Sequence, residues 1–144
     1  MDLSELLRKE RVEKFQSDSN QIRNQVEIAK SDLSSAKKIL GIEEWRVAHN
    51  EAYNAMLQAG VALMFSKGYR PKGQEHHVAV IEFVQAVYSA KFRPEVLQAF
   101  EKARKRRNDA VYDTPNVISA SQAQNLVKYA DTFVSTALEL LHMV

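Results

Sequence analysis

The sequence predicts an all-α protein, folded as an antiparallel bundle of four to five helices. Apolar residues recur at helical spacing along most of the chain, and no stretch shows the alternation typical of a strand. The four glycines and three prolines fall between these periodic stretches, where connections are expected. A chain of 144 residues has the length of one domain, so we expect a single domain over residues 1–144.

Residues 1–18 are expected to form an N-terminal extension helix. The apolar residues of this charged segment stand at loose helical spacing: Leu3, Leu6, Leu7 and Val12. The polar run at residues 17–20 then offers several N-caps, because Ser, Asp and Asn side chains accept hydrogen bonds from free backbone N–H groups. The bundle itself is therefore expected over residues 20–142.

The first two bundle helices are expected over residues 20–40 and 43–67. Gly41 stands between them, where a helix end favours a residue able to take a positive φ. The second helix is the most apolar of the chain, and one face carries small residues: Ala48, Ala52, Ala55, Ala59 and Gly60. Small side chains allow a neighbouring helix to approach closely, as in the central hairpin of a bundle.

Further helices follow the connection at residues 68–73. A shorter helix is expected over residues 74–89. Pro94 suits the first turn of the next helix, because the missing N–H of proline is not needed there. Pro115 disfavours continuation of that helix past Thr114. Ser119 is a capping residue that opens the last helix.

The composition excludes several classes of site and location. The chain has no cysteine, which removes disulfides, thiolate nucleophiles and cysteine-based metal sites. The first residues lack the basic start and apolar run of a signal peptide. The longest apolar run, residues 59–65, is far shorter than the roughly 18 residues that span a bilayer. We therefore expect a soluble, cytoplasmic protein that does not associate with a membrane.

The most informative stretch is residues 102–113, which read KARKRRNDAVYD. Five of the first six residues are basic, and the rest of the chain has 15 Lys and Arg against 18 Asp and Glu. This stretch is therefore the strongest positive region of the surface, and it favours an anionic partner such as phosphate. The alternative is that these cations offset the dipole of a helix C-terminus and extend into solvent.

Helical spacing predicts which of these arginines face the bundle. Steps of three and four residues from Phe100 reach Arg104 and Arg107, and Arg106 lies on the neighbouring line. A guanidinium near the bundle needs a carboxylate, phosphate or carbonyl partner. The candidate phosphate- or RNA-binding residues are Arg104, Arg106, Arg107 and Asn108. The alternative is ion pairing with a carboxylate from the same helix: Glu101, Asp109 or Asp113.

The histidines do not predict a metal site. His76 and His77 are adjacent, so their side chains point about 100° apart on a helix and make a poor metal-binding pair. Either can cap the start of the helix or act as a general base, since an unperturbed histidine titrates near neutrality. His49 lies within the apolar helix and is expected to be a core histidine. We expect no metal and no cofactor.

Several motifs together resemble the HEPN domain. The segment EAYNAM at residues 51–56 continues into the small residues of its helix and is followed by SKGYRPK at residues 66–72. The histidines come next, and RNDAVYD at residues 107–113 precedes a last amphipathic helix. The resemblance covers residues 20–141 and is strongest to small prokaryotic members whose late motif reads Arg-x-x-Ala-x-Tyr.

This resemblance implies a helical bundle that forms a homodimer. Many members are metal-independent ribonucleases, often toxins encoded beside a minimal nucleotidyltransferase. Their signature is an arginine followed, after four to six residues, by a histidine. The arginine holds the scissile phosphate, and the histidine takes part in proton transfer from the 2′-hydroxyl. The arginine carries over to Arg107 or Arg106, with Asn108 beside it.

The histidine of the signature is replaced in this chain. Tyr112 or Val111 stands at that position, depending on whether Arg107 or Arg106 is the matching arginine. Tyrosine is a weak base near neutral pH, because its reference pKa is about 10. Tyr112 is the candidate that replaces the base, with His76 or His77 as the alternative. Tyr112 also matches a tyrosine that nucleotidyltransferase partners modify in some members.

Three hypotheses on function follow. The first is a catalytically weak or inactive protein of a toxin–antitoxin-like system, which binds RNA or nucleotide phosphate beside a nucleotidyltransferase-type partner. The second is an active endoribonuclease toxin that uses Arg107 with a non-standard base. The third is a structural dimeric adaptor whose arginines are paired within the protein and contact no nucleic acid.

Overall fold

The computed structural model describes residues 1–112 and 118–143, with the side chains of residues 109–112 outside the description. The elements in chain order are α1 (Leu3–Arg8), β1 (Val12–Lys14), α2 (Ser19–Gly41), α3 (Trp45–Lys67), β2 (Tyr69–Pro71), α4 (His76–Tyr88), α5 (Pro94–Tyr112) and α6 (Ala120–Leu140). The all-α prediction is confirmed. Five of the six helices in the described residues, α2 to α6, form the bundle as expected, while α1 belongs to the N-terminal segment, and two short strands accompany the helices.

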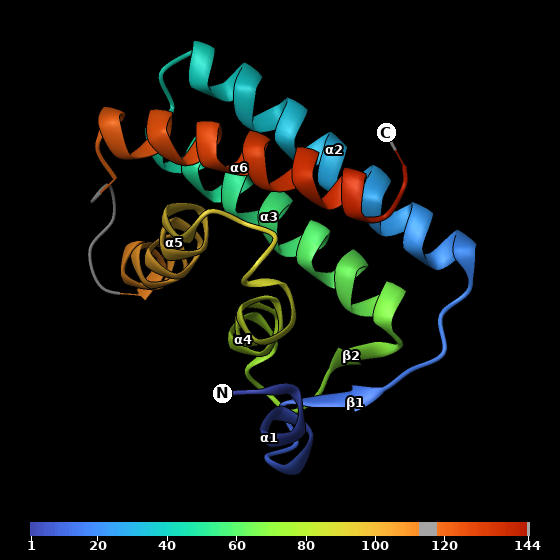
Figure 1. The fold of residues 1–144 in the computed structure, drawn as a ribbon. Helices are drawn as coiled ribbons and strands as arrows, with labels where there is room; N and C mark the ends of the chain where they lie inside the picture. Colours follow the sequence, from blue (N-terminus) through green and yellow to red (C-terminus); the bar gives the residue numbers. More distant parts are fainter. Residues whose placement is uncertain (113–117, 144) are drawn as a thin grey trace.

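Helix α3 is the centre of the bundle. Figure 1 shows α2 and α6 along one side of it and α4 and α5 on the other, and α3 packs against all four. Its sequence is apolar because a helix with neighbours on most sides keeps only a narrow, half-exposed stripe for polar residues, here Glu51, Asn54 and Gln58. The N-terminal end of α4 and the middle of α5 thereby meet near the same face of α3.

The helix ends follow their local sequence with one exception. Asp18 and Ser119 each form a capping box at the start of α2 and α6, as their residue types predict. Pro94 is the first residue of α5, and Gly68 ends α3 at φ 88°. The expectation for Gly41 is wrong: α2 runs through Gly41, and the positive φ of 62° belongs to Glu43.

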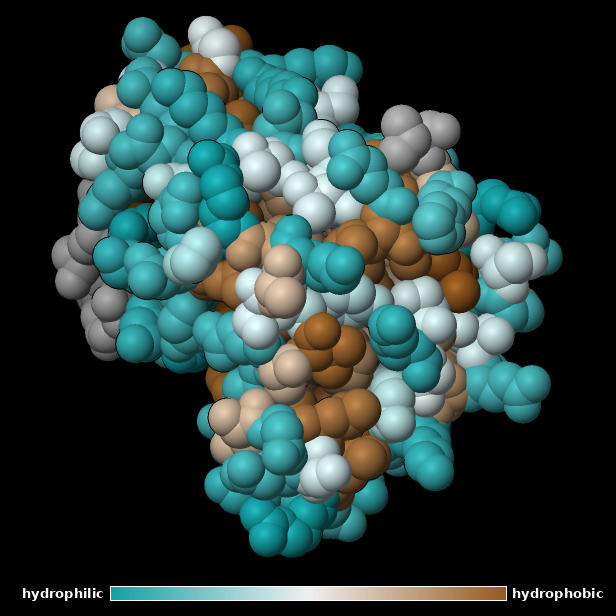
Figure 2. All heavy atoms as spheres, in the orientation of Figure 1, coloured by the Kyte–Doolittle hydropathy of each residue, from teal (hydrophilic) through white to brown (hydrophobic). Residues whose placement is uncertain are grey.

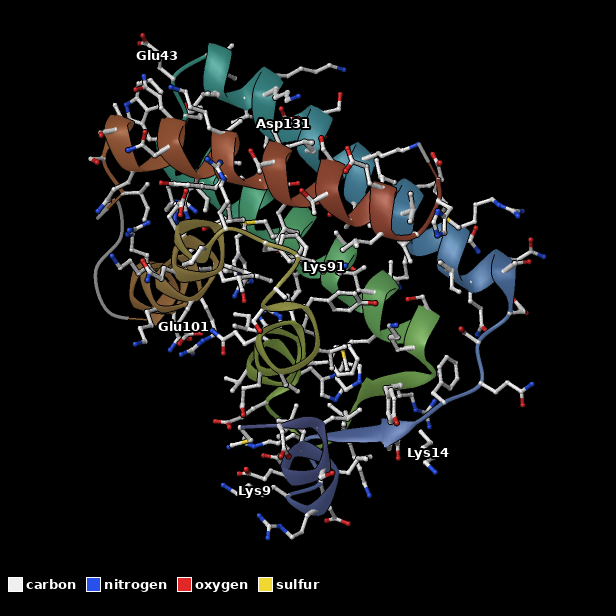
Figure 3. All side chains as sticks on the ribbon, in the orientation of Figure 1. Lys9, Lys14, Glu43, Lys91, Glu101 and Asp131 are labelled. Carbon is white, nitrogen blue, oxygen red and sulfur yellow. The ribbon has the colours of Figure 1, made fainter. Side chains whose placement is uncertain are left out.

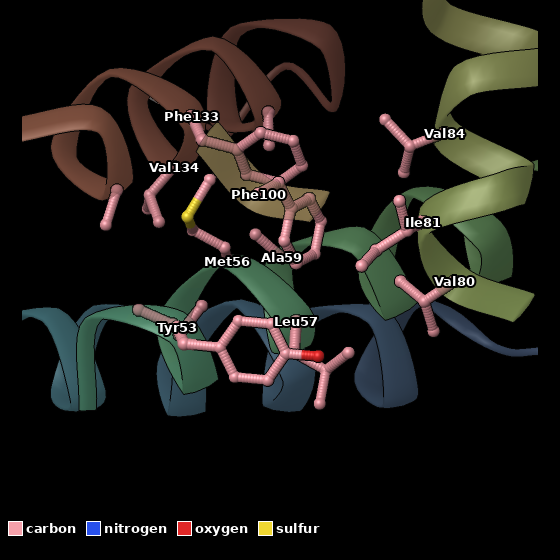
Figure 4. Close-up of a cluster of buried hydrophobic side chains, with 14 of the residues drawn as sticks. Tyr53, Met56, Leu57, Ala59, Val80, Ile81, Val84, Phe100, Phe133 and Val134 are labelled. Carbon is pink, nitrogen blue, oxygen red and sulfur yellow. The ribbon is translucent and has the colours of Figure 1, made fainter. Parts of the chain in front are cut away.

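The core is built around aromatic side chains from three helices. Figure 4 shows Tyr53 and Met56 of α3 together with Phe100 of α5 and Phe133 of α6. The ring of Phe100 lies edge-on to Phe133 at 5.2 Å and to Tyr53 at 5.8 Å between centroids. Edge-to-face contacts of this kind add to the free energy gained by burying the rings. Phe100 therefore fixes the position of α5 on the bundle.

The N-terminal arm, residues 1–15, differs from the expected extension helix. Helix α1 ends at Arg8, Glu10 takes a φ of 56°, and β1 pairs with β2 in an antiparallel register that places Val12 opposite Pro71. Val12 is buried and Lys14 exposed, which is an alternation too short to read from the sequence. The arm packs on the bundle, because Leu6 of α1 is fully buried in the core.

Glycine at position 60 allows α4 to lie close to α3. A Cβ atom built on Gly60 would stand 2.6 Å from Cγ1 of Val80, which is closer than side-chain atoms approach one another. Val80 lies three residues after His77 in α4. The absence of a side chain at Gly60 therefore sets how near α4, and the histidines at its start, come to α3.

The face of the molecule drawn in Figure 2 is mostly polar. Figure 2 shows hydrophilic residues over much of one face, with smaller apolar patches between them. The large apolar side chains that are exposed among the described residues are Met1, Ile28 and Ile42. In the part of the chain that the structure describes, no helix is long and apolar enough to cross a membrane.

Candidate phosphate-binding site

Three side chains of α5 lie on one side of the helix and face a groove toward α4. Arg104, Arg107 and Asn108 are three and four residues apart, so they share a face. The groove has a volume of about 750 Å³ and is also lined by the start of α4 and the residues before it, with His76, His77 and Glu75 as the titratable members. The structure thus brings together three predicted residues and both predicted histidines.

Arg107 is a half-buried cation of this groove. Its guanidinium carbon lies 5.9 Å from the centre of the Tyr53 ring, and the tyrosine is fully buried. The Nε atom of Arg107 is buried and has no hydrogen-bond partner within the described residues. An arginine held over an aromatic ring can present its other guanidinium N–H groups to an anion in the groove.

Arg104 is already paired. Its Nη2 lies 2.8 Å from Oε1 of Glu101, one turn earlier on α5. Figure 3 shows Glu101 at the edge of α5, among the side chains on its outer surface. Among the side chains that the structure describes, no carboxylate lies within ion-pair distance of Arg106 or Arg107. The expected pairing with Glu101 is therefore made by Arg104 instead.

His77 is joined to the core through Tyr53. Its Nδ1 lies 3.0 Å from the Tyr53 hydroxyl, and the two rings are 5.6 Å apart. Burial lowers the pKa of His77 below its usual value, and the positive charges of Arg107, His76 and Arg104 lower it further. Burial raises the pKa of Tyr53, so its hydroxyl keeps its proton. His77 is therefore a neutral imidazole near neutral pH, held beside Arg107.

The capping role expected for the histidines is not the one observed. Glu75 is the residue before α4, no side chain caps the helix there, and His76 and His77 are its first two residues. His76 is exposed at the mouth of the groove. Glu75 is the carboxylate among the described residues of the groove, and its Oε2 lies 2.7 Å from Nη1 of Arg11 in the N-terminal arm.

Arg106 points away from this groove. Its Nη1 lies 3.5 Å from Nε2 of His49, which is fully buried in α3 as its apolar helix predicts. Arg106 also lines a separate cavity of about 200 Å³ between α5 and α6. Arg106 and Arg107 follow each other in sequence, yet they line different cavities because neighbouring helical residues point about 100° apart.

The remaining predicted residues fall outside the described side chains. Those of Tyr112 and Asp109 belong to this group, and Asp113 lies outside the described residues altogether. Sequence reasoning missed the role of Tyr53, although it belongs to the EAYNAM segment. Its only signal was a polar hydroxyl on an otherwise apolar face. Within the described residues, no three His, Asp or Glu side chains converge as a metal site requires.

Comparison with known proteins gives a family and a fold. The model of the HEPN domain matches residues 22–141 of this chain. Among solved structures, the crystal structure of TT1696 from Thermus thermophilus is similar, with a TM-score of 0.66 and 16% sequence identity over 83% of this chain and 98% of that one. At this identity the likeness shows the fold alone. A search of curated proteins found no match.

Proposed function

This chain belongs to the HEPN domain family, and from that premise we propose that it binds RNA through phosphate held in the groove between α4 and α5. The observation that carries the proposal is the position of Arg107. Its guanidinium lies over the buried ring of Tyr53 and shares the groove with Arg104 and Asn108. Arginine binds phosphate with several donors at once, and the aromatic ring beneath it limits how far it can turn.

The proposal extends to the setting in which the chain acts. It is a catalytically weak or inactive component of a toxin–antitoxin-like system in the cytoplasm, works as a homodimer, and has a nucleotidyltransferase-type protein as partner. The family supports this setting. Tyr112 at the position of the signature histidine supports weak catalysis, because a tyrosine with a pKa near 10 is a poor base at neutral pH. Light scattering during gel filtration tests the homodimer, and co-purification tests the partner.

The test of the proposal is RNA binding by wild type and by Arg107→Gln, in EDTA, at about 50 and 200 mM salt. The substitution removes the charge and keeps a hydrogen-bonding, though shorter, side chain. Loss of a charge-assisted contact is expected to weaken binding by about ten- to a hundredfold. Arg23→Gln is the matched control, because Arg23 is exposed on α2 at a distance from the groove. Equal affinities of wild type and Arg107→Gln would refute the proposal.

A second function, ribonuclease activity, is favoured by the contact between His77 and Tyr53. When Nδ1–H of His77 donates to the Tyr53 oxygen, Nε2 of the neutral ring is left to accept a proton. In such a reaction the 2′-oxygen attacks the phosphate, its proton passes to Nε2, and the same proton goes to the departing 5′-oxygen. Arg107 holds the charge that builds up on the phosphate oxygens.

Cleavage assays separate these candidates. Metal-independent cleavage by wild type that is lost in both Arg107→Gln and His77→Gln would establish the nuclease with His77 as base. Cleavage lost in Tyr112→Phe but kept in His77→Gln would assign the base to Tyr112. Binding without cleavage supports the first proposal. If wild type neither binds nor cleaves RNA, the adaptor hypothesis remains, and removing the charge of Arg107 is then expected to change stability alone.

A further inference from the structure

A second group of polar side chains lies on the opposite side of α5, facing α6. Lys102 and Arg106 are four residues apart and share one face of the helix. We call the cavity of about 200 Å³ beside them the α5–α6 groove. The polar and aromatic residues of its lining are Glu95, Gln98, Lys102, Arg106, Gln122, Asn125 and Tyr129. Three of these, Gln98, Gln122 and Asn125, are amides.

Arg106 is held in place from inside the bundle. His49 is fully buried, and burial lowers its pKa to about 4, so its ring is neutral at ordinary pH. Its Nδ1 lies 3.4 Å from the Asn50 side-chain oxygen, which only a protonated Nδ1 can contact favourably. Nε2 is then the acceptor for Nη1 of Arg106 at 3.5 Å. One N–H of the guanidinium is thus committed to the core, and four remain for other acceptors.

The lining of this groove suits a nucleic acid strand. Two cations provide contacts for phosphate, and the amides of Gln98 and Asn125 can pair with the exposed edges of unpaired bases. Tyr129 is half-buried in α6 and offers an aromatic ring on which a base can stack. Among the described residues that line this groove, Glu95 is the one carboxylate, so the two cations outnumber it.

We propose that the α5–α6 groove is a second phosphate-binding site and that the ligand is a single RNA strand that crosses the outer side of α5 between the two grooves. The inference rests on the proposed function of the α4–α5 groove. A helix with its side chains is about 10–12 Å across, so a single nucleotide, with its phosphate at one end, cannot place anions on both sides. Lys105 lies exposed on the outer side of α5 between the grooves, where its Nζ is 3.9 Å from Oε1 of Glu101, and adds a third cation.

The test compares the binding of a uridine dinucleotide and an octanucleotide, measured by fluorescence anisotropy at several salt concentrations. Wild type is expected to bind the longer strand more tightly, because only that strand reaches both grooves. Lys102→Gln/Arg106→Gln is expected to bind the dinucleotide as wild type does. It is expected to lose the gain in affinity that wild type shows for the longer strand. Each lost phosphate contact lowers the slope of log affinity against log salt by about 0.7 for a single strand.

Two further variants keep the test sharp. Lys30→Gln/Lys38→Gln removes the same charge from exposed positions of α2 and is expected to keep the gain with length. Lys102→Gln alone changes an exposed side chain, so it keeps the fold and is expected to lower the salt slope by about 0.7. This single variant still tests the second site if the double variant does not fold.

The outcomes are distinguishable. If Lys102→Gln/Arg106→Gln keeps the affinity and salt slope of wild type for the octanucleotide, while Arg107→Gln weakens binding, the second site is refuted and the first stands. The same holds if wild type binds both lengths equally. If wild type binds neither strand, the proposed function and this inference fail together. Loss of the gain with length in the Lys102/Arg106 variant, but not in the α2 control, supports the second site.

Discussion

Replacing Gly60 with alanine tests the close approach of α4 to α3. In an open helix this change is stabilising by about 1 kcal/mol, because glycine loses more backbone entropy on folding than alanine. Here the added methyl group would stand 2.6 Å from Cγ1 of Val80 and 3.6 Å from Cγ2 of Val84. Val80 is buried and branched at Cβ, so it cannot turn away freely.

The two effects oppose each other, and overpacking is the larger. Adding a methyl group to a tight core costs about 1–3 kcal/mol. With the helix gain subtracted, Gly60→Ala is expected to lower the free energy of unfolding by about 1 kcal/mol and the melting temperature by about 3 °C. Because Val80 follows His77 by one turn, the displacement of α4 should also weaken the contact between His77 and Tyr53.

Urea titrations give the free energies of unfolding of wild type and Gly60→Ala. Two other variants provide the comparison. Gly41→Ala is the control, since nothing lies within 4 Å of the added Cβ at the exposed end of α2. It is expected to stabilise the protein by about 0.5–1 kcal/mol. In a Val80→Ala background the cost of Gly60→Ala should shrink or reverse, because the clashing methyl groups are gone. Stabilisation by Gly60→Ala equal to that of Gly41→Ala would refute the close packing of α3 and α4.

Other expected effects concern the buried histidine, the N-terminal arm and the tyrosine of the groove. Burial lowers the pKa of His49 to about 4 against 6.5 in the unfolded chain, so the unfolded chain binds the extra proton between those values. The free energy of unfolding should therefore fall as the pH drops from 6.5 towards 4, by up to about 1.4 kcal/mol per pH unit. In His49→Gln this fall should be shallower. Urea titrations that give the same dependence of the free energy of unfolding on pH for both proteins would contradict the prediction. Leu6→Ala is expected to lower the free energy of unfolding by about 2–4 kcal/mol, because Leu6 is fully buried. Leu7→Ala is expected to lower it less, because Leu7 is only half-buried. Tyr53→Phe removes the hydroxyl bonded to His77 and is expected to lower the free energy of unfolding by about 1 kcal/mol, as measured by thermal unfolding. An unchanged stability would indicate that this hydrogen bond does not stabilise the protein.

The parts of the fold that were predictable are those governed by local chemistry. The capping boxes at Asp18 and Ser119 and the start of α5 at Pro94 each depend on residues within one turn. The face shared by Arg104 and Arg107 was also predictable, because helical periodicity alone determines it. In contrast, β1 and β2 have three residues each, and three residues are too few to show alternation.

The contacts that define the candidate site lay beyond sequence reasoning. Tyr53 and His77 are 24 residues apart, and Arg106 and His49 are 57 residues apart. Both pairs meet only because α4 and α5 cross α3 at particular heights. Periodicity indicates that a residue faces inward, but it does not say which residue of another helix stands opposite. The divergence of Arg106 and Arg107 into separate grooves became visible only with those partners in place.

The N-terminal arm has a consequence for where this domain is taken to begin. The family match starts at residue 22, yet Leu6 and Val12 fill the core from outside that boundary. A fragment cut at residue 22 would leave their places empty and would release Glu75 from Arg11, so its carboxylate could turn toward the arginines of the groove. In this chain the folded domain extends beyond the segment that matches the family. Experiments on a fragment that starts at residue 22 would therefore examine a domain with an incomplete core.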